Sequence, residues 1–274
     1  MVMSIGSGYA AAVSNRHLDK TDRNLGLELA RLSAGKRVLS AKDDAASLAI
    51  GSRLEADVSA QRQAYQNAGQ AASMLRVADG GMGNTSDILT RMKSLAVQAS
   101  SGQLSADDRR ALNTEFQQLA SEVERISSDT EFAGTNLLDG STAAVDVKVG
   151  TGTGPSDEVS ADLADTSTAS LGLTGLDIST EASADAASAA ITNAIDAVQD
   201  LRADNGASQS RLDYARDNIA TGIENTEAAR SNLLDLDVAD ATARKILLQT
   251  QLQAGVYASQ QSNRSAKSML SLLA

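Results

Sequence analysis

The longest pattern along the chain is a heptad repeat of apolar and small residues over residues 54–99. It forms two rows three or four positions apart, the spacing that keeps both rows on one face of a helix. Gly80, Gly81 and Gly83 lie inside it and weaken the helix by about 1 kcal/mol each, but the register continues past them. We therefore expect one long coiled-coil-like helix with a soft spot and no domain break. The rows are Leu54, Gln61, Ala68, Leu75, Met82, Leu89 and Ala96, and Val58, Tyr65, Ala72, Ala78, Thr85, Met92 and Ala99.

Further helices follow from the same kind of pattern. Ser105, with Asp108 three residues later, has the spacing of a capping box and predicts a helix start. The apolar stripe that follows, Leu112 to Ile126, predicts a helix that folds back antiparallel on the first. Heptad spacing returns over 186–237, and a last helix is expected over about 240–273. The apolar stripe of that last helix is Ala243, Leu247, Thr250, Ala254 and Tyr257.

The middle of the chain, residues 141–185, is acidic, rich in Gly, Ser and Thr, and the least helical part. Val145, Val147 and Val149 alternate with polar residues, which predicts a short strand, and the apolar residues of 171–178 allow one or two more. Residues 132–140 are expected to form a turn. The predicted fold is therefore mainly α, with long antiparallel coiled-coil-like helices formed from both chain ends and a small central β-hairpin region.

Residues 31–50 combine a helix stop with a helix start. Gly35 follows a leucine stripe where a C-terminal glycine cap belongs. Ser40 precedes Asp43 by three residues, the capping-box spacing, and Asp43 and Asp44 suit the positive end of a helix dipole. The pattern predicts two helices joined by a short basic link, residues 36–39.

The amino-acid sequence of residues 31–50 closely resembles the N-terminal signature of bacterial flagellins. In that signature a leucine-serine-glycine turn leads into a serine-alanine-lysine-aspartate-aspartate run. Residues 89–100, 115–127 and 130–140 also match the family, and residues 232–274 resemble its C-terminal segment. The resemblance covers about 1–140 and 186–274 and leaves a short insert between them.

The resemblance implies a domain plan and a function. Residues 1–39 and 238–274 would form a terminal inner-core coiled coil, and 40–140 with 186–237 a helical rod that builds the outer tube. Residues 141–185 would be a short variable insert. A flagellin self-polymerises into the bacterial flagellar filament, the helical propeller for swimming, and its export needs no cleaved signal peptide. Partners implied are further copies, other flagellins, hook-associated and cap proteins, the flagellar export chaperone and the vertebrate Toll-like flagellin receptor.

The resemblance and the spacing also indicate which residues would take part in assembly and in recognition. The assembly helices offer an apolar set that consists of Leu18, Leu25, Leu29, Leu32, Leu247, Ala254, Leu270, Leu272 and Leu273. Positions matching the family's surface for the innate receptor and for protofilament packing are Leu89, Arg91, Leu95, Gln98 and Glu115. Arg91 and Leu95 are four residues apart, so we expect them to share one helix face.

Composition narrows the function classes. A net charge of −11 argues against a nucleic-acid or anionic-membrane footprint, and no apolar run is long enough to span a membrane. There is no Cys, and His17 is the only His, so no metal set and no catalytic constellation can be assembled. We expect neither an enzyme nor a cofactor.

Two other readings of the chain stay open at this point. The hook-filament junction protein shares both terminal signatures and would form a short ring instead of a long filament. A tip or translocator protein of a secretion needle would need a membrane-active apolar hairpin, which the sequence does not contain.

Overall fold

The computed structural model describes the backbone of residues 2–152 and 154–273, and the side chains of residues 9, 12–152 and 154–265. The chain divides into two compact units. The first unit consists of Met1–Ala56 with Asn225–Ala274, and the second of Asp57–Glu224. The two longest helices, α2 (Ala45–Ala99) and α4 (Glu181–Leu234), have residues in both.

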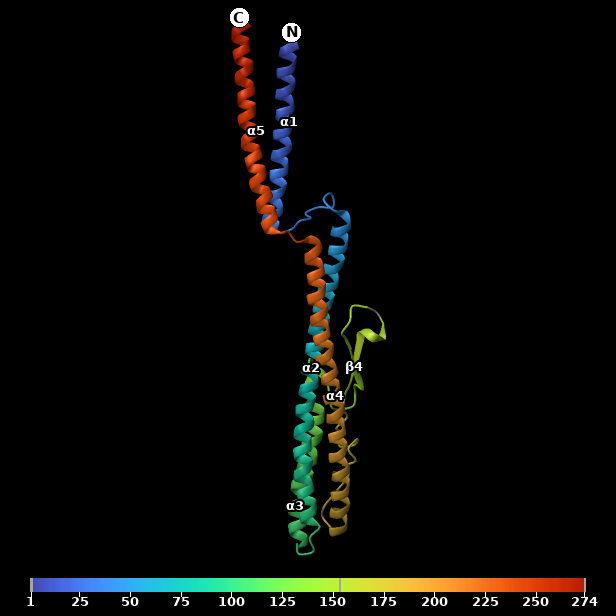
Figure 1. Ribbon diagram of the computed structural model, residues 1–274. Helices are drawn as coiled ribbons and strands as arrows, with labels where there is room; N and C mark the ends of the chain where they lie inside the picture. The colour runs from blue at the N-terminus through green and yellow to red at the C-terminus, as the bar shows by residue number, and fades with distance from the viewer. Residues whose placement is uncertain (1, 153, 274) are drawn as a thin grey trace. The chain divides into compact units, whose positions relative to one another are not determined.

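The first unit is built on α1 (Val2–Ala34) and α5 (Val238–Leu273), which lie side by side with the two termini at the same end (Figure 1). Leu18 packs on Gly255, where an added Cβ would lie 2.6 Å from the Leu18 Cδ2 atom. Leu25 and Leu32, one and two heptads further on, are also half-buried. This row is the seam of α1 toward α5.

The seam of α5 differs from the predicted stripe. Leu248 and Leu252 are half-buried, whereas Leu247 and Tyr257 are 57% and 72% exposed and Ala254 is exposed. The stripe predicted from the sequence therefore lies on the face of α5 that the chain leaves open. The cause is that α5 carries apolar residues on both faces, and only one of them packs against α1.

The link between α1 and α2 ends and restarts the helices with local hydrogen bonds. Gly35 has a φ of +66°, the left-handed conformation expected of a C-terminal cap. The helix start is displaced from the prediction, because Ser40 and Asp43 form a turn before α2 and Asp44 is the cap. The Asp44 carboxylate accepts hydrogen bonds from the backbone N–H of Ser47 at 3.0 Å and from its hydroxyl at 2.6 Å.

The second unit packs α2, α3 (Ala106–Asp129) and α4 around a core of small and aliphatic side chains. The heptad rows of α2 are buried from Ala68 through Ala99, as predicted. α2 continues through its glycines without a break. Gly81 has a packing reason, because a Cβ there would lie 2.6 Å from the Leu138 Cδ1 atom.

Two small hairpins connect α3 to α4. β1 (Glu131–Phe132) pairs with β2 (Thr135–Asn136), and β3 (Ala144–Lys148) pairs antiparallel with β4 (Glu158–Asp162). A short 3-10 helix, η1 (Pro155–Asp157), precedes β4.

The apolar residues of 171–178, which were expected to allow one or two strands, form none. The partner of β3 is β4, which lies earlier in the chain. β4 alternates apolar Val159 and Ala161 with polar neighbours, a signal that the sequence offered. Leu171, Leu173 and Ile178 are buried in a strand-free segment, where they fill the core of the second unit.

Candidate functional site

An ion pair on the surface of the second unit joins α2 to α3. The Arg91 Nε and Nη2 atoms donate to the Glu115 Oε1 atom at 2.9 and 2.6 Å. Both side chains remain about half exposed. Gln98, two turns further along α2, is exposed as well. These three residues form a polar patch that we call the Arg91 patch.

Leu89 and Leu95 do not belong to this surface. Their exposed fractions are 0% and 1%, because both lie on the heptad face of α2 that packs into the core. Arg91 and Leu95 were expected to share one helix face within the receptor and protofilament surface, but Leu95 is buried while Arg91 is exposed. Both leucines are buried in the core of the second unit, so a partner cannot reach them in this conformation.

The position of α3, and with it Glu115, depends on caps at the turn after α2. Ser105 and Asp108 form the predicted capping box, and the hydrogen bond from the Ser105 hydroxyl holds the pKa of Asp108 below its usual value. Arg109 adds a contact that the sequence did not reveal. Its Nε and Nη2 atoms donate to the carbonyl oxygens of Ala99 and Ser101 at 2.8 and 2.9 Å, at the end of α2.

The link is tied to the end of α4 by a second arginine. The Arg37 Nη2 atom donates to the Leu233 carbonyl oxygen at 2.7 Å, and the Arg37 backbone N–H donates to the Leu234 carbonyl at 2.7 Å. The Leu236 N–H in turn donates to the Gly35 carbonyl at 3.1 Å. These hydrogen bonds join the link between α1 and α2 to the connection between α4 and α5. The sequence motif of residues 31–50 had predicted only the link between α1 and α2.

Exposed apolar side chains are frequent on the terminal helices. On α1, Leu27 and Leu29 are 38% and 44% exposed. On α5, Ile246, Leu247, Val256 and Tyr257 are all exposed. Leu247 and Tyr257 belong to the predicted stripe of α5, and a contiguous exposed apolar row of this kind marks an interaction surface. The side chains of Leu270, Leu272 and Leu273 lie outside the described residues.

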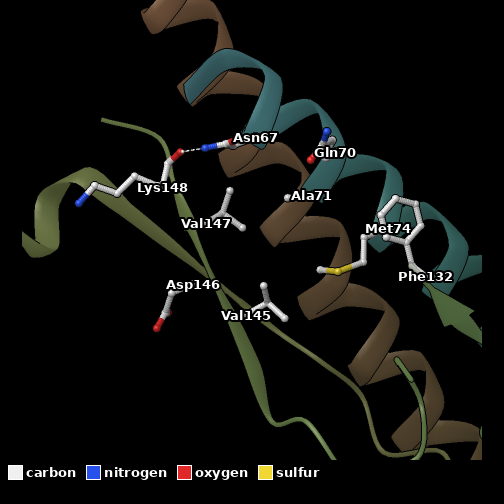
Figure 2. Close-up of a pocket in the computed structure, with 9 residues that line it drawn as sticks. All are labelled: Asn67, Gln70, Ala71, Met74, Phe132, Val145, Asp146, Val147 and Lys148. Atoms are coloured by element: carbon white, nitrogen blue, oxygen red, sulfur yellow. Dashed lines mark hydrogen bonds between the residues drawn. The ribbon is translucent and has the colours of Figure 1, made fainter. Parts of the chain in front are cut away.

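A shallow cleft of about 340 Å³ lies between α2 and the β3–β4 hairpin. Figure 2 shows Val145 and Val147 pointing toward α2, while the side chains of Asp146 and Lys148 point away from it. The Asn67 Nδ2 atom donates to the Lys148 carbonyl oxygen at 3.3 Å and pins the hairpin to the helix. The cleft wall is apolar, with its polar groups at the rim, so the arrangement holds a hairpin in place and gathers no acid–base pair.

Among the described residues, no group of three or more His, Cys, Asp or Glu side chains is arranged to hold a metal ion. Within the same residues, no helix is both long and apolar enough to cross a membrane.

Comparison with known sequences decides the family. The profile of the bacterial flagellin N-terminal helical region matches residues 5–143, and that of the bacterial flagellin C-terminal helical region matches residues 188–273. The chain belongs to the bacterial flagellin family. It is accordingly a structural subunit of the flagellar filament, and the hook-filament junction reading has less support.

Relatives support this along the full chain. A flagellin of Halalkalibacterium halodurans is 36% identical over 224 residues, which are 79% of this chain and 82% of that protein. A flagellar filament 33 kDa core protein of Treponema phagedenis is 30% identical over 289 residues, 99% of this chain and 100% of that protein. The crystal structure of Bacillus cereus flagellin matches with a TM-score of 0.52 and 30% identity, over 60% of this chain and 94% of that one.

Proposed function

We propose that this flagellin polymerises through the open face of its α1–α5 pair, and that its role is mechanical and not catalytic. The observation that carries the proposal is the exposed apolar row on α5, with Leu247 and Tyr257 more than half exposed. Burial of apolar surface is worth about 25 cal/mol per Å², so repeated burial of this row between copies supplies a driving force for assembly.

The proposal assigns separate roles to the parts of the chain. Residues 1–39 and 238–274 form the inner core of the filament, and 40–140 with 186–237 form the outer tube. Residues 141–185 face solvent as a short insert. Support comes from the pairing of α1 with α5 and from the sharp link at Gly35, which ends one helix pair and begins the next.

The proposed partners follow from membership in the family. They are further copies of this chain, other flagellins, hook-associated and cap proteins, the export chaperone and, through the Arg91 patch, the vertebrate Toll-like flagellin receptor. We propose that the filament built from these subunits lies outside the cell.

The test is seeded polymerisation of the full chain, followed by sedimentation and electron microscopy. Leu247→Asp should raise the concentration needed for polymerisation by about tenfold or more, because it places a charge in a row that assembly would bury. Gln249→Asp adds the same charge at an exposed polar position on the same helix and should change it little.

The outcomes separate the alternatives. Long tubes from the wild type and none from a chain lacking residues 1–34 and 240–274 support the proposal. Equal polymerisation of both aspartate variants would overturn the role of the α5 face. Short rings from the wild type, under conditions that polymerise another flagellin, would favour the hook-filament junction protein.

A further inference from the structure

Asn205 is a buried polar residue in the apolar seam between α2 and α4. It is 5% exposed, and its Nδ2 atom donates to the Leu75 carbonyl oxygen on α2 at 3.0 Å. Its Oδ1 atom is buried and has no hydrogen-bond partner in the structure. The amide therefore contributes one donor to the seam and leaves one acceptor unsatisfied, which makes the pairing of α2 with α4 sensitive to the chemical state of this side chain.

The residue after Asn205 is Gly206, and this is the only Asn–Gly step in the sequence. Packing does not demand glycine there, because an added Cβ would meet no other atom within 4 Å. Glycine in a helix interior weakens the helix. The step therefore has a cost in the fold and no visible structural benefit.

An Asn–Gly step has a chemistry of its own when the backbone is free. The Gly206 backbone nitrogen, unhindered by a side chain, attacks the Asn205 Cγ atom. The N–H proton is lost, a five-membered succinimide closes, and the side-chain nitrogen leaves as ammonia. Water then adds to either ring carbonyl and opens the ring to aspartate or isoaspartate. The net reaction consumes one water and releases one ammonia, with no oxidant or cofactor.

The folded helix blocks this attack. Both residues lie inside α4, so the backbone is held at helical angles and the glycine N–H takes part in helix hydrogen bonding. The Asn205 amide is meanwhile held on the Leu75 carbonyl of the neighbouring helix. We propose that Asn205–Gly206 is a deamidation site that the paired α2 and α4 helices mask, and that becomes reactive when the pair opens.

Either product, aspartate or isoaspartate, would destabilise the helix pair that had masked the site. An aspartate would replace the donor to the Leu75 carbonyl with a second acceptor and bury a carboxylate without a partner. An isoaspartate would in addition insert a backbone carbon into α4. A subunit that stays unfolded long enough to react therefore loses stability irreversibly, whereas the folded subunit is protected.

The reaction can be followed on one tryptic peptide of the full chain. Cleavage after Arg202 and Arg211 releases residues 203–211, whose single Asn is Asn205. The peptide of residues 217–230, with Asn218 before an isoleucine and Asn225 before a threonine, is an internal reference. The chain is incubated at one pH and temperature in native buffer and in unfolding urea, and both peptides are scored by mass for conversion of asparagine to aspartate.

We expect residues 203–211 to convert in urea faster than the reference peptide, and at least about tenfold more slowly in native buffer, since the rate follows the population of open states. Gly206→Ala should keep the fold and suppress conversion in urea. Equal rates in the two buffers, conversion no faster than the reference, or undiminished conversion in Gly206→Ala would each overturn the proposal.

A second measurement tests the consequence. Asn205→Asp should lower the urea midpoint of unfolding, whereas Asn218→Asp, at an exposed position of the same helix, should leave it nearly unchanged. Equal midpoints for the two variants would show that the modification does not disturb the seam.

Discussion

At the residue scale, Arg91 offers a direct test of the proposed recognition surface. We predict that Arg91→Ala lowers the response of reporter cells carrying the Toll-like flagellin receptor by about tenfold, because a charged side chain at the centre of an interface often dominates binding. Folding stability should change by less than about 1 kcal/mol, since the Arg91–Glu115 pair is exposed.

The control for this variant is Arg125→Ala on α3. Arg125 has the same 56% side-chain exposure as Arg91 and is also ion-paired, with Glu122 and Asp129. A response lowered equally by both variants would point to a general effect of surface charge, and an unchanged response with Arg91→Ala would remove the patch from the proposal.

Gly81 and Gly83 separate two effects of glycine in one helix. We predict that Gly81→Ala destabilises the chain by about 1–3 kcal/mol, because the new Cβ would collide with the buried side chain of Leu138. Gly83→Ala meets no atom within 4 Å and should instead stabilise it by up to about 1 kcal/mol. Urea unfolding followed by circular dichroism measures both, and equal midpoints for the two variants would contradict the packing argument.

At the scale of elements, the turn between α2 and α3 depends on Arg109. Arg109→Ala removes the hydrogen bonds to the carbonyls of Ala99 and Ser101, and we predict a loss of about 1–2 kcal/mol of unfolding free energy. Arg110→Ala is the matched control, because this neighbour is exposed and pairs only locally with Asp107. A melting temperature lowered as much by the control would show that charge, and not capping, is responsible.

The sequence predicted the buried face of a helix where the apolar pattern of that helix points to one face only. Heptad spacing identified the buried face of α2 because its two rows of apolar and small residues keep their register from Ala68 to Ala99. It could not choose the seam of α5, where the adjacent Leu247 and Leu248 are both apolar but only Leu248 is half-buried. Leu89 stood in the buried heptad row and in the proposed surface at once, and the structure supports only the first. The caps made by Arg37 and Arg109 depend on where distant carbonyls lie, which spacing along the chain does not reveal.

At the scale of the whole molecule, hydrogen-bonded carboxylates are spread over both units. Hydrogen bonds from serine hydroxyls hold the pKa values of Asp43, Asp44 and Asp108 below the usual aspartate value, and the Ser141 hydroxyl does the same for Asp139. Because the folded pKa is the lower one, each group contributes stability that is fully present above its unfolded pKa. That contribution is lost as the pH falls through the folded pKa.

We therefore predict that the urea midpoint of the monomer falls steadily below about pH 4, the usual range of an aspartate, in enough salt to screen the surface charges. Salt matters because the net charge of −11 is neutralised near the isoelectric point of 4.6, and the accompanying loss of repulsion would otherwise offset the effect. Ser105→Ala should flatten part of this acid dependence, since it removes the hydrogen bond that lowers the pKa of Asp108. Ser128→Ala, whose hydroxyl donates to a backbone carbonyl and not to a carboxylate, should leave the slope unchanged. A midpoint that stays level or rises between pH 5 and 3 would show that these caps do not set the acid stability of the subunit.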